Sequence, residues 1–581
     1  MILQALNDYY ETLNRNLDYT ERLPAFGWSK TLVQFALFIN SSGDLVQIVP
    51  LTDENNKSGL PQVVPLQLKR SGTKPPPYFL CDLAMYVLGI QENTVTQKSK
   101  NYFESFSKHT QEILSSTNCP EAKAVVSYLQ KWNVEAAADH PAVKEAMQYS
   151  LSKGKCVFFL NDSSSWVLDS PIIKDAWNHY YEKTCEEGDV GICLVTGQYA
   201  PIARIHNSVK GLRTNVVAAN GWTLVGFDKG SPAFSSYGKE QGYNAPTSKA
   251  AAFAYTTALN YLLADRDHVF RTGDTTVIYW AQSGEAAYQD LFGSVYSDAY
   301  EEEDLRHMVE ELCKGHGVEF DDTMLEPNMN FYVLGLSPNA ARLSVRFFMR
   351  NTFGEFLKHI EAHRNRLKIS RPNYAKYEVP SLKSLLDATV NQNSRDKQAS
   401  PEMAGEMLRA ILNDTPYPAT LLNGVVLRMR AERVVTWPRA AILKAYYLKR
   451  PNKDIPAEEV LTVSLNEAST SVPYNLGRLF SVLENIQQKA NPGINVTIKD
   501  KYFNSASATP AVVFPVLINL AQKHLKKLPD GQRIYFERSM QSILDKLGED
   551  FPIRLNLPQQ GAFQLGYYHQ TQARYQTKED N

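Results

Sequence analysis

The sequence predicts an α+β protein in which a mixed N-terminal region with antiparallel hairpins precedes an all-α C-terminal helical bundle. Strand-like runs recur in pairs around short turns of Gly, Pro, Asn and Ser through the first two thirds of the chain. Amphipathic helices lie between these pairs without a regular strand–helix alternation, which favours α+β over a doubly wound sheet. After about residue 395, helical periodicity replaces the strand-like runs.

The N-terminal elements follow from the periodicity of the apolar residues. Residues 2–14 carry apolar side chains at helical spacing and predict a helix. Paired runs predict four hairpins: TLVQFALFI with LVQIV, KCVFFL with WVLD, GICLVT with IARIH, and NFYVLGL with ARLSVRFFM. TTVIYWA predicts one more strand, and SKAAAFAYTTALNYLLA and TFGEFLKHIEAHRNRL predict helices.

We expect three regions along the chain. Residues 1–395 form the mixed α+β body, and the polar segment NQNSRDKQASPE ends it as linkers do. Residues 396–460 form a basic helical connector, in which Thr436 is the expected N-cap and Pro438 fits the first helical turn. Residues 461–581 form the bundle, with helices predicted at NLGRLFSVLENIQ, VFPVLINLAQKHL, FERSMQSILDKL and GAFQLGYYHQTQ.

Charge and composition exclude several classes of protein. The 581 residues include 61 Lys and Arg against 62 Asp and Glu, so any contact with nucleic acid must be local or shared with partner chains. The six cysteines form no CxxC pair, which argues against a disulfide framework and a zinc site. The N-terminus lacks a signal-peptide pattern and no 18-residue apolar run occurs, so we expect a cytoplasmic protein without membrane contact.

Motifs for catalysis are missing from the sequence. No phosphate-binding Gly loop, GxGxxG or GxSxG is present. His359 and His363 have the spacing of two metal ligands, but without HExxH they are interpreted as a solvated basic helix face. The acidic pair Asp321–Asp322 and the run Glu301–Asp304 are interpreted as solvated carboxylates. We therefore expect no metal, no cofactor and no enzymatic activity.

A cationic loop is the first candidate for binding nucleic acid. It precedes the stiff segment PPPYF and consists of Lys69, Arg70, Ser71, Gly72, Thr73 and Lys74. Backbone N–H groups and cations in such a loop could hold phosphates or enter a DNA groove. An exposed loop with ordinary lysines is the alternative.

Three further basic groups are candidates. The loop IARIHNSVKGLR carries Asn207, Lys210 and Arg213. On the strand ARLSVRFFMR, Arg342 and Arg346 share one face and Arg350 follows, which suits a nucleic-acid backbone or simply a solvated sheet face. Arg428, Arg430 and Arg433 lie near Trp437 and two tyrosines, a pattern compatible with single-strand binding.

Several long blocks resemble one known family. They are MILQALNDYY, GICLVTGQYAPIARIHNSVKG, SYGKEQGYNAPTSKAAAFAYTTALNYLL, NFYVLGLSPNAARLSVRFF with TFGEFL after it, and GAFQLGYYHQ. In order and spacing they are similar to the large (Cas-eight-type) subunit of the type I-C CRISPR Cascade over essentially the whole chain. One position departs from the family pattern: Leu83 in FLCDLA stands where a polar residue is expected.

The resemblance implies a non-catalytic subunit of an antiviral ribonucleoprotein. Its partners would be a guide RNA (crRNA), target double-stranded DNA and the displaced single strand, other Cascade subunits, and a separate nuclease-helicase. The subunit would recognise the protospacer-adjacent motif in duplex DNA and help open the duplex into an R-loop. The C-terminal bundle, from about residue 460, would resemble a small subunit that is also made separately. A metal-dependent nuclease and a protein-only assembly scaffold remain the alternatives.

Overall fold

The computed structural model describes residues 1–16, 23–52, 58–67, 75–186, 188–214, 221–227, 238–296, 303–394, 397 and 399–576. Among these residues, helices account for 51% and strands for 16%, which confirms the predicted α+β class. The chain divides into two compact units, described separately below. The first comprises Met1–Gly211, Val217–Ala264 and Ala340–Leu343, and the second comprises Leu212–Val216, Asp265–Asn339 and Ser344–Asn581. The boundaries predicted at 395 and 460 both fall inside the second unit, so this division does not test them.

The elements of the first unit are mixed. They are α1 (Ile2–Asn16), β1 (Trp28–Val33), β2 (Phe35–Ile39), β3 (Leu45–Pro50), β4 (Leu60–Pro65), β5 (Cys81–Leu83), α2 (Ala84–Val87), α3 (Gln97–Leu114), α4 (Pro120–Lys131), α5 (Pro141–Met147), β6 (Lys155–Leu160), β7 (Ser165–Trp166), α6 (Pro171–Glu186), β8 (Val190–Ile192), β9 (Tyr199–Pro201) and α7 (Lys249–Ala264). The predicted N-terminal helix is confirmed as α1, which packs against α7 through Tyr10 and Phe253.

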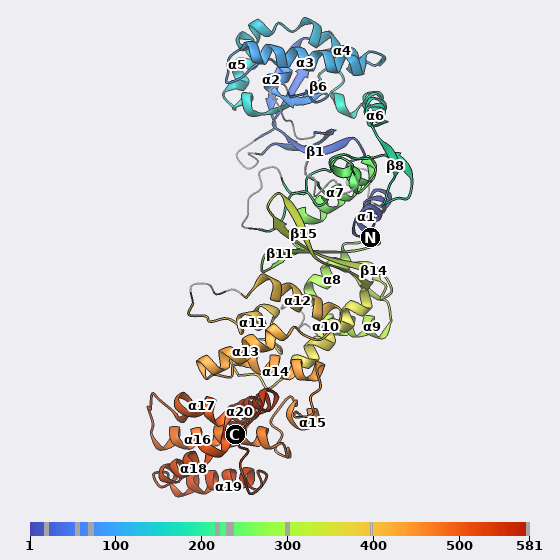
Figure 1. Ribbon diagram of the computed structural model, residues 1–581. Coiled ribbons are helices and arrows are strands. Elements are labelled where there is room, and N and C mark those ends of the chain that lie inside the picture. Colours follow the sequence, from blue (N-terminus) through green and yellow to red (C-terminus); the bar gives the residue numbers. More distant parts are fainter. Residues whose placement is uncertain are drawn as a thin grey trace. The chain divides into compact units, whose positions relative to one another are not determined.

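A sheet with the strand order β3-β2-β6-β5 organises the first unit, and β7 pairs with β6. β2 runs antiparallel to β3 and parallel to β6, and Figure 1 shows α3 and α4 beside β6. The predicted hairpin at NSSGD is confirmed, with Gly43 in the left-handed conformation at its turn. The predicted strand over residues 31–39 is interrupted at Gln34, between β1 and β2. The side chain of Gln34 accepts the N–H of Lys155 and donates to the carbonyl of Ser58.

The hairpin predicted from GICLVT and IARIH differs in its second strand. The strands are β8 and β9, so Tyr199–Pro201, expected in the turn, are extended, whereas 202–206 are not a strand. The turn closes earlier because the N–H of Cys193 donates to the carbonyl of Gln198, and Gly197 takes a positive φ of 72°. The thiol of Cys193 accepts the N–H of Ser248, which ties this turn to the start of α7.

The second unit begins with a sheet and continues in helices. Its elements are β10 (Val269–Thr272), β11 (Thr275–Ala281), α8 (Ala287–Tyr296), α9 (Glu303–Lys314), β12 (Val318–Phe320), β13 (Thr323–Leu325), β14 (Asn330–Asn339), β15 (Arg342–Thr352), α10 (Phe353–Leu367), α11 (Leu382–Asp387), α12 (Pro401–Leu412), α13 (Ala419–Glu432), α14 (Trp437–Lys449), α15 (Ala457–Val460), α16 (Val472–Ala490), α17 (Ile498–Ala508), α18 (Pro510–Leu525), α19 (Asp530–Leu544) and α20 (Leu557–Gln576). The tip of the β14–β15 hairpin is grouped with the first unit.

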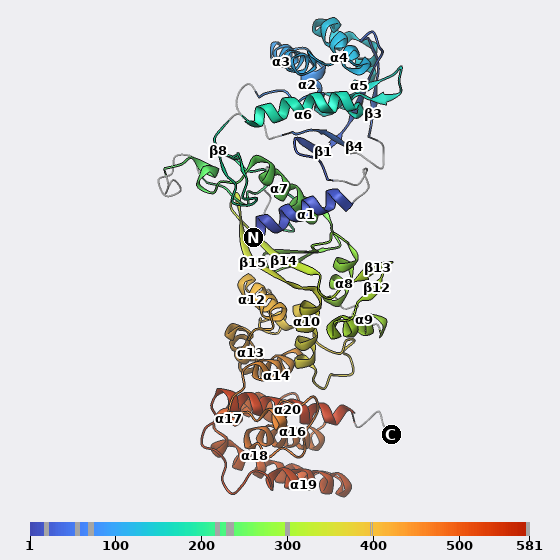
Figure 2. The same cartoon turned by 90° about the vertical axis from the view of Figure 1, so that its right-hand side faces the viewer.

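The sheet of the second unit has the order β10-β11-β14-β15, which confirms TTVIYWA as a strand and the predicted hairpin of β14 and β15. Its core face carries Tyr279, Phe331 and Phe347, which belong to one hydrophobic core with residues of α8, α10 and α12. The small hairpin of β12 and β13 lies beside α8 and α9 (Figure 2). The same core continues into the C-terminal helices, so the second unit is built around one continuous interior.

The C-terminal region contains the four predicted helices, as α16, α18, α19 and α20, and α17, which was not predicted. α16 and α20 cross closely because both carry glycine at the contact. A Cβ on Gly477 would lie 1.9 Å from the carbonyl oxygen of Phe563, and one on Gly566 would lie 2.0 Å from that of Tyr474. Thr436 is the N-cap residue of α14, as predicted, although its side chain makes no capping hydrogen bond. Among the described residues, no helix is long and apolar enough to span a membrane.

The start of α16 is capped by a distant carboxylate. Glu459 accepts the backbone N–H groups of Thr470 at 2.6 Å and Ser471 at 3.0 Å, and the hydroxyl of Ser469 at 3.2 Å. These bonds, led by the one from Thr470, lower the pKa of Glu459. A carboxylate at a helix N-terminus satisfies open N–H groups and complements the helix dipole.

Candidate nucleic-acid interface

The predicted cationic loop, Lys69–Lys74, lies outside the described residues, but both of its ends are anchored in the first unit. Before it, Gln67 donates from Nε2 to the carbonyl of Cys81 at 2.8 Å and accepts from Nζ of Lys155 at 2.6 Å. After it, the carbonyl of Pro75 accepts the hydroxyl of Tyr86 at 2.9 Å. The described residues on either side of the loop are thus hydrogen-bonded to the first unit, Gln67 to β5 and β6 and Pro75 to α2.

Leu83, which departs from the family pattern, follows a buried aspartate and is itself partly buried. Asp82 is 1% exposed, and its carboxylate accepts the N–H of Tyr78 at 2.8 Å and that of Leu83 at 2.7 Å. The side chain of Leu83 is partly buried and packs against the core of the first unit. This position therefore supports the fold with an apolar side chain instead of offering a polar contact.

The group Asn207, Lys210 and Arg213 is held by backbone contacts. The N–H of Lys210 donates to Oδ1 of Asn260 at 2.8 Å, which leaves the exposed lysine free to extend outward. Arg213 is partly buried, and its guanidinium donates to the carbonyl of Arg266. Nearby His206 is buried beside the hydroxyl of Tyr255 at 2.6 Å, and burial lowers its pKa to about 4, so this ring carries no positive charge at neutral pH.

The arginines of β15 lie on the strand face that the period-two pattern predicted, opposite the buried Leu343, Phe347 and Met349. Arg346 donates to Oδ2 of Asp274 at 2.7 Å, and that carboxylate also accepts the hydroxyl of Ser337 at 2.8 Å. Burial raises the pKa of Asp274, but the bonds from Ser337 and Arg346 outweigh it and lower the pKa. Arg350 lies over the ring of Tyr332, 5.9 Å from its centroid. A phosphate of a nucleic-acid backbone bound there would compete with Asp274 for the guanidinium of Arg346.

Arg428, Arg430 and Arg433 are held within the second unit. Arg430 donates to Oε1 of Gln560 on α20 at 2.8 Å, and Arg433 donates to the carbonyl of Asp500 on α17. Arg428 lies 3.6 Å from Glu432 across one helical turn. These contacts join α13 to the C-terminal helices. Binding of nucleic acid by the three residues stays a prediction.

The interpretation of His359 and His363 as a solvated face is wrong. His363 is 7% exposed, and its Nδ1 lies 2.7 Å from the hydroxyl of Tyr417. Burial, followed by the charges of Arg366 and Arg364, lowers its pKa to about 3. Nδ1 of His359 lies 2.6 Å from the carbonyl of Leu412. The apolar surroundings could not be inferred from the basic residues that flank both histidines in sequence.

The described residues of the carboxylate clusters lie in a turn and at a helix start. Asp321 and Asp322 both have positive φ angles and form the turn between β12 and β13, while Glu303 and Asp304 occupy the first turn of α9. Glu301 and Glu302 lie outside the described residues. In the part of the chain that the structure describes, no group of three or more His, Cys, Asp or Glu could hold a metal ion.

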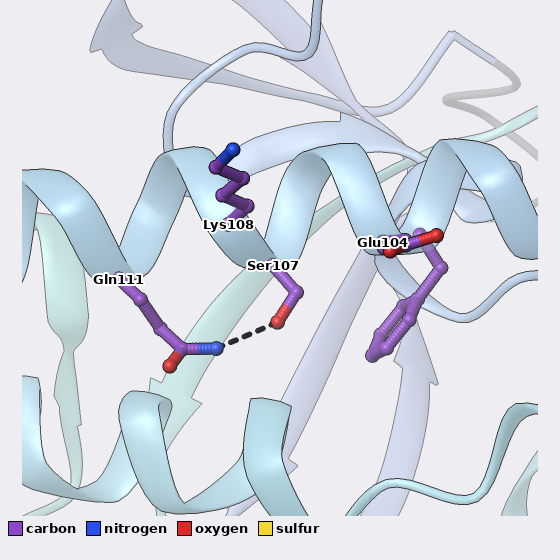
Figure 3. A pocket seen from close by; sticks show the side chains of 5 residues that line it. Glu104, Ser107, Lys108 and Gln111 are labelled. Carbon is purple, nitrogen blue, oxygen red and sulfur yellow. Dashed lines mark hydrogen bonds between the residues drawn. The ribbon is translucent and has the colours of Figure 1, made fainter.

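An open hollow lies along α3 and is lined by Phe103, Glu104, Ser107, Lys108 and Gln111 (Figure 3). Nε2 of Gln111 donates to the hydroxyl of Ser107 at 2.8 Å. All five residues come from one helix, and they include one cation and one carboxylate. None of the residues predicted from the sequence lines this hollow.

One basic segment was missed by the sequence analysis. Residues 364–376, at the end of α10 and after it, contain five cations and no carboxylate. Arg366 pairs with Asp414 at 2.6 Å, and Lys368 pairs with Glu378 at 3.4 Å. The excess of positive charge was visible in the sequence, but the predicted helix ended at Leu367 and the residues after it were not considered.

The fold and the candidate site define an α+β protein with several separated cationic segments. The family model of CRISPR-associated protein (Cas_Csd1) matches residues 6–575. The chain therefore belongs to the Cas_Csd1 family and is a CRISPR-associated, Cascade-type subunit, which confirms the resemblance found in the sequence. No curated protein matches the chain.

Proposed function

We propose that this protein is the non-catalytic large subunit of a type I-C CRISPR surveillance complex in the cytoplasm. It recognises the protospacer-adjacent motif in duplex DNA, helps open the duplex into an R-loop and docks a separate nuclease-helicase. The observation that carries the proposal is the family match over residues 6–575. In such RNA-guided complexes, base pairing reads the target sequence while protein reads the short adjacent motif.

Within this proposal, the cationic loop Lys69–Lys74 contacts the duplex. Its anchors at Gln67 and Pro75 support this role, because a loop with fixed ends loses less conformational entropy when it binds. The near-neutral chain fits as well, since the guide RNA and partner subunits share the binding of a long target.

Charge reversal tests the loop. In the guide-loaded complex, Lys69→Glu with Lys74→Glu should weaken binding of a duplex that carries the adjacent motif. The negative slope of log K against log salt should become shallower by about 1.8, which corresponds to the loss of two phosphate contacts. Lys108→Glu is the matched control, because Lys108 is exposed on α3 of the same unit. Equal duplex binding by the double variant and wild type would remove the loop from the interface.

Purification from the native operon tests the function as a whole. A tagged chain should bring down a multi-subunit particle containing uniform short RNAs with repeat-derived ends. Recovery of protein partners without RNA would favour an assembly scaffold instead. Cleavage of nucleic acid by the chain alone after addition of Mg²⁺ would favour a nuclease.

A further inference from the structure

The turn at residues 371–376, which follows α10, presents an aromatic ring to solvent. Tyr374 is 85% exposed. The N–H of Ala375 donates to the carbonyl of Pro372 at 2.9 Å, so Asn373 and Tyr374 occupy the tip of a tight turn. An isolated exposed tyrosine is common, but here it is combined with a fixed base and with unpaired charge.

The base of this turn is held in the second unit. Ser370 is buried, and its N–H donates to the carbonyl of Val463 at 2.7 Å. Its own carbonyl accepts the hydroxyl of Tyr568 at 2.6 Å. Ile369 before it is also buried, as is Pro372 after it. The backbone on the N-terminal side of Tyr374 is therefore held, which lowers the entropy lost when a ligand contacts the ring.

Four of the five cations of the segment divide into two groups. Arg366 and Lys368 form the ion pairs described above, whereas Arg371 and Lys376, on either side of Tyr374, are exposed. Across the described residues, neither Arg371 nor Lys376 forms an ion pair, and Nζ of Lys376 lies 5.2 Å from the ring centroid of Tyr377. The tip thus combines an exposed aromatic ring with two cations that no carboxylate neutralises.

We propose that the turn at 371–376 binds single-stranded nucleic acid, with a base stacked on Tyr374 and phosphates against Arg371 and Lys376. Unpaired bases stack on exposed aromatic rings, while cations beside them follow the backbone. A duplex keeps its bases stacked on each other, so the ring selects a single strand. The inference rests on the proposed function, in which the strand is either the guide RNA or the displaced DNA strand.

Variants of the full-length chain test this proposal by fluorescence anisotropy with labelled DNA and RNA strands of about 16 nucleotides. Tyr374→Ala should weaken single-strand binding by about five- to a hundredfold, whereas Tyr374→Phe, which keeps the ring, should bind like wild type. Arg371→Ala with Lys376→Ala should lower the salt slope by about 1.4. Tyr149→Ala and Lys383→Ala are controls at another exposed tyrosine and another exposed lysine.

The outcomes separate this proposal from the proposed function. A loss confined to RNA would assign the turn to the guide, and a loss confined to DNA would assign it to the displaced strand. If Tyr374→Ala binds both strands as Tyr149→Ala does, the proposal is overturned. The same holds if the variant loses a protein partner but no nucleic acid. Normal duplex recognition by the guide-loaded variant complex would show that the proposed function is intact in either case.

Discussion

His268 is the residue whose charge is most clearly set by its neighbours in the fold. Its Nδ1 lies 2.6 Å from Oδ2 of Asp265, and its Nε2 lies 2.7 Å from Oδ1 of Asp290 on α8. Burial lowers the pKa of His268, but the two carboxylates outweigh burial and raise the pKa above the usual 6.5. An imidazole with a carboxylate at each nitrogen donates from both only when it is protonated. The ring therefore holds the start of β10 against α8 in its charged form.

This arrangement predicts a pH-dependent contribution to stability. The folded-state pKa is raised, so the contribution is fully present below the unfolded pKa of about 6.5 and is lost as pH rises through the folded value. His268→Gln should cost about 2 kcal/mol at pH 6 and less in alkaline buffer. Urea unfolding of wild type and variant across this range measures the difference. His179→Gln, at an exposed histidine on α6, is the control, and a difference independent of pH would contradict the assignment.

For single residues, the sequence predicted which face of an element a side chain occupies better than it predicted the side chain's tertiary partners. The period-two face of Arg342, Arg346 and Arg350 followed from strand geometry alone. The partner of Arg346 did not, because Asp274 lies in the turn between β10 and β11, 72 residues away in sequence. His363 was misassigned for the same reason, since Tyr417, which covers it, lies 54 residues further along.

At the scale of elements, the contact between α16 and α20 depends on two glycines. Gly477→Ala should destabilise the second unit by about 1–3 kcal/mol or more, because its Cβ would meet the backbone of Phe563, which has no rotamer to change. Gly405→Ala on α12 is the matched control, since its Cβ meets nothing within 4 Å. The control should be neutral or stabilise by up to about 1 kcal/mol. Thermal unfolding compares the two, and equal midpoints would refute the close packing.

The helices α7, α10, α16 and α20 were predicted from their apolar residues, whereas α3 and α6, which are of similar length, were not. α17 was missed because its 11 residues carry few apolar side chains, although Thr497 and Asp500 form a capping box at its start. The hairpin of β8 and β9 was shifted because its turn depends on hydrogen bonds of Cys193 to Gln198 and Ser248, which no periodicity reveals. Hydrophobic periodicity predicts the bounds of a helix or strand when one of its faces is buried. Where no face is buried, tertiary contacts set the bounds.

At the scale of the whole molecule, the balance of charge sets an expectation for binding. With a formal net charge of -1, the chain has no general attraction for DNA, and its cations are gathered in separate segments. The chain alone should therefore bind duplex DNA at least about tenfold more weakly than the guide-loaded complex does at the same salt concentration. Filter binding of both forms to one duplex measures this. Equal affinities would mean that the chain binds the duplex without its partners.

The cap at the start of α16 also concerns any shorter product of the same reading frame. Glu459 lies 11 residues before Thr470, so a polypeptide that begins after Val460 contains the helix but not its carboxylate. The N–H groups of Thr470 and Ser471 would then face water, and the first turn of α16 would fray more readily. These two N–H groups and the hydroxyl of Ser469 could then donate to an external anion. A separately translated bundle would thus differ chemically, at one defined helix end, from the identical residues in the full-length chain.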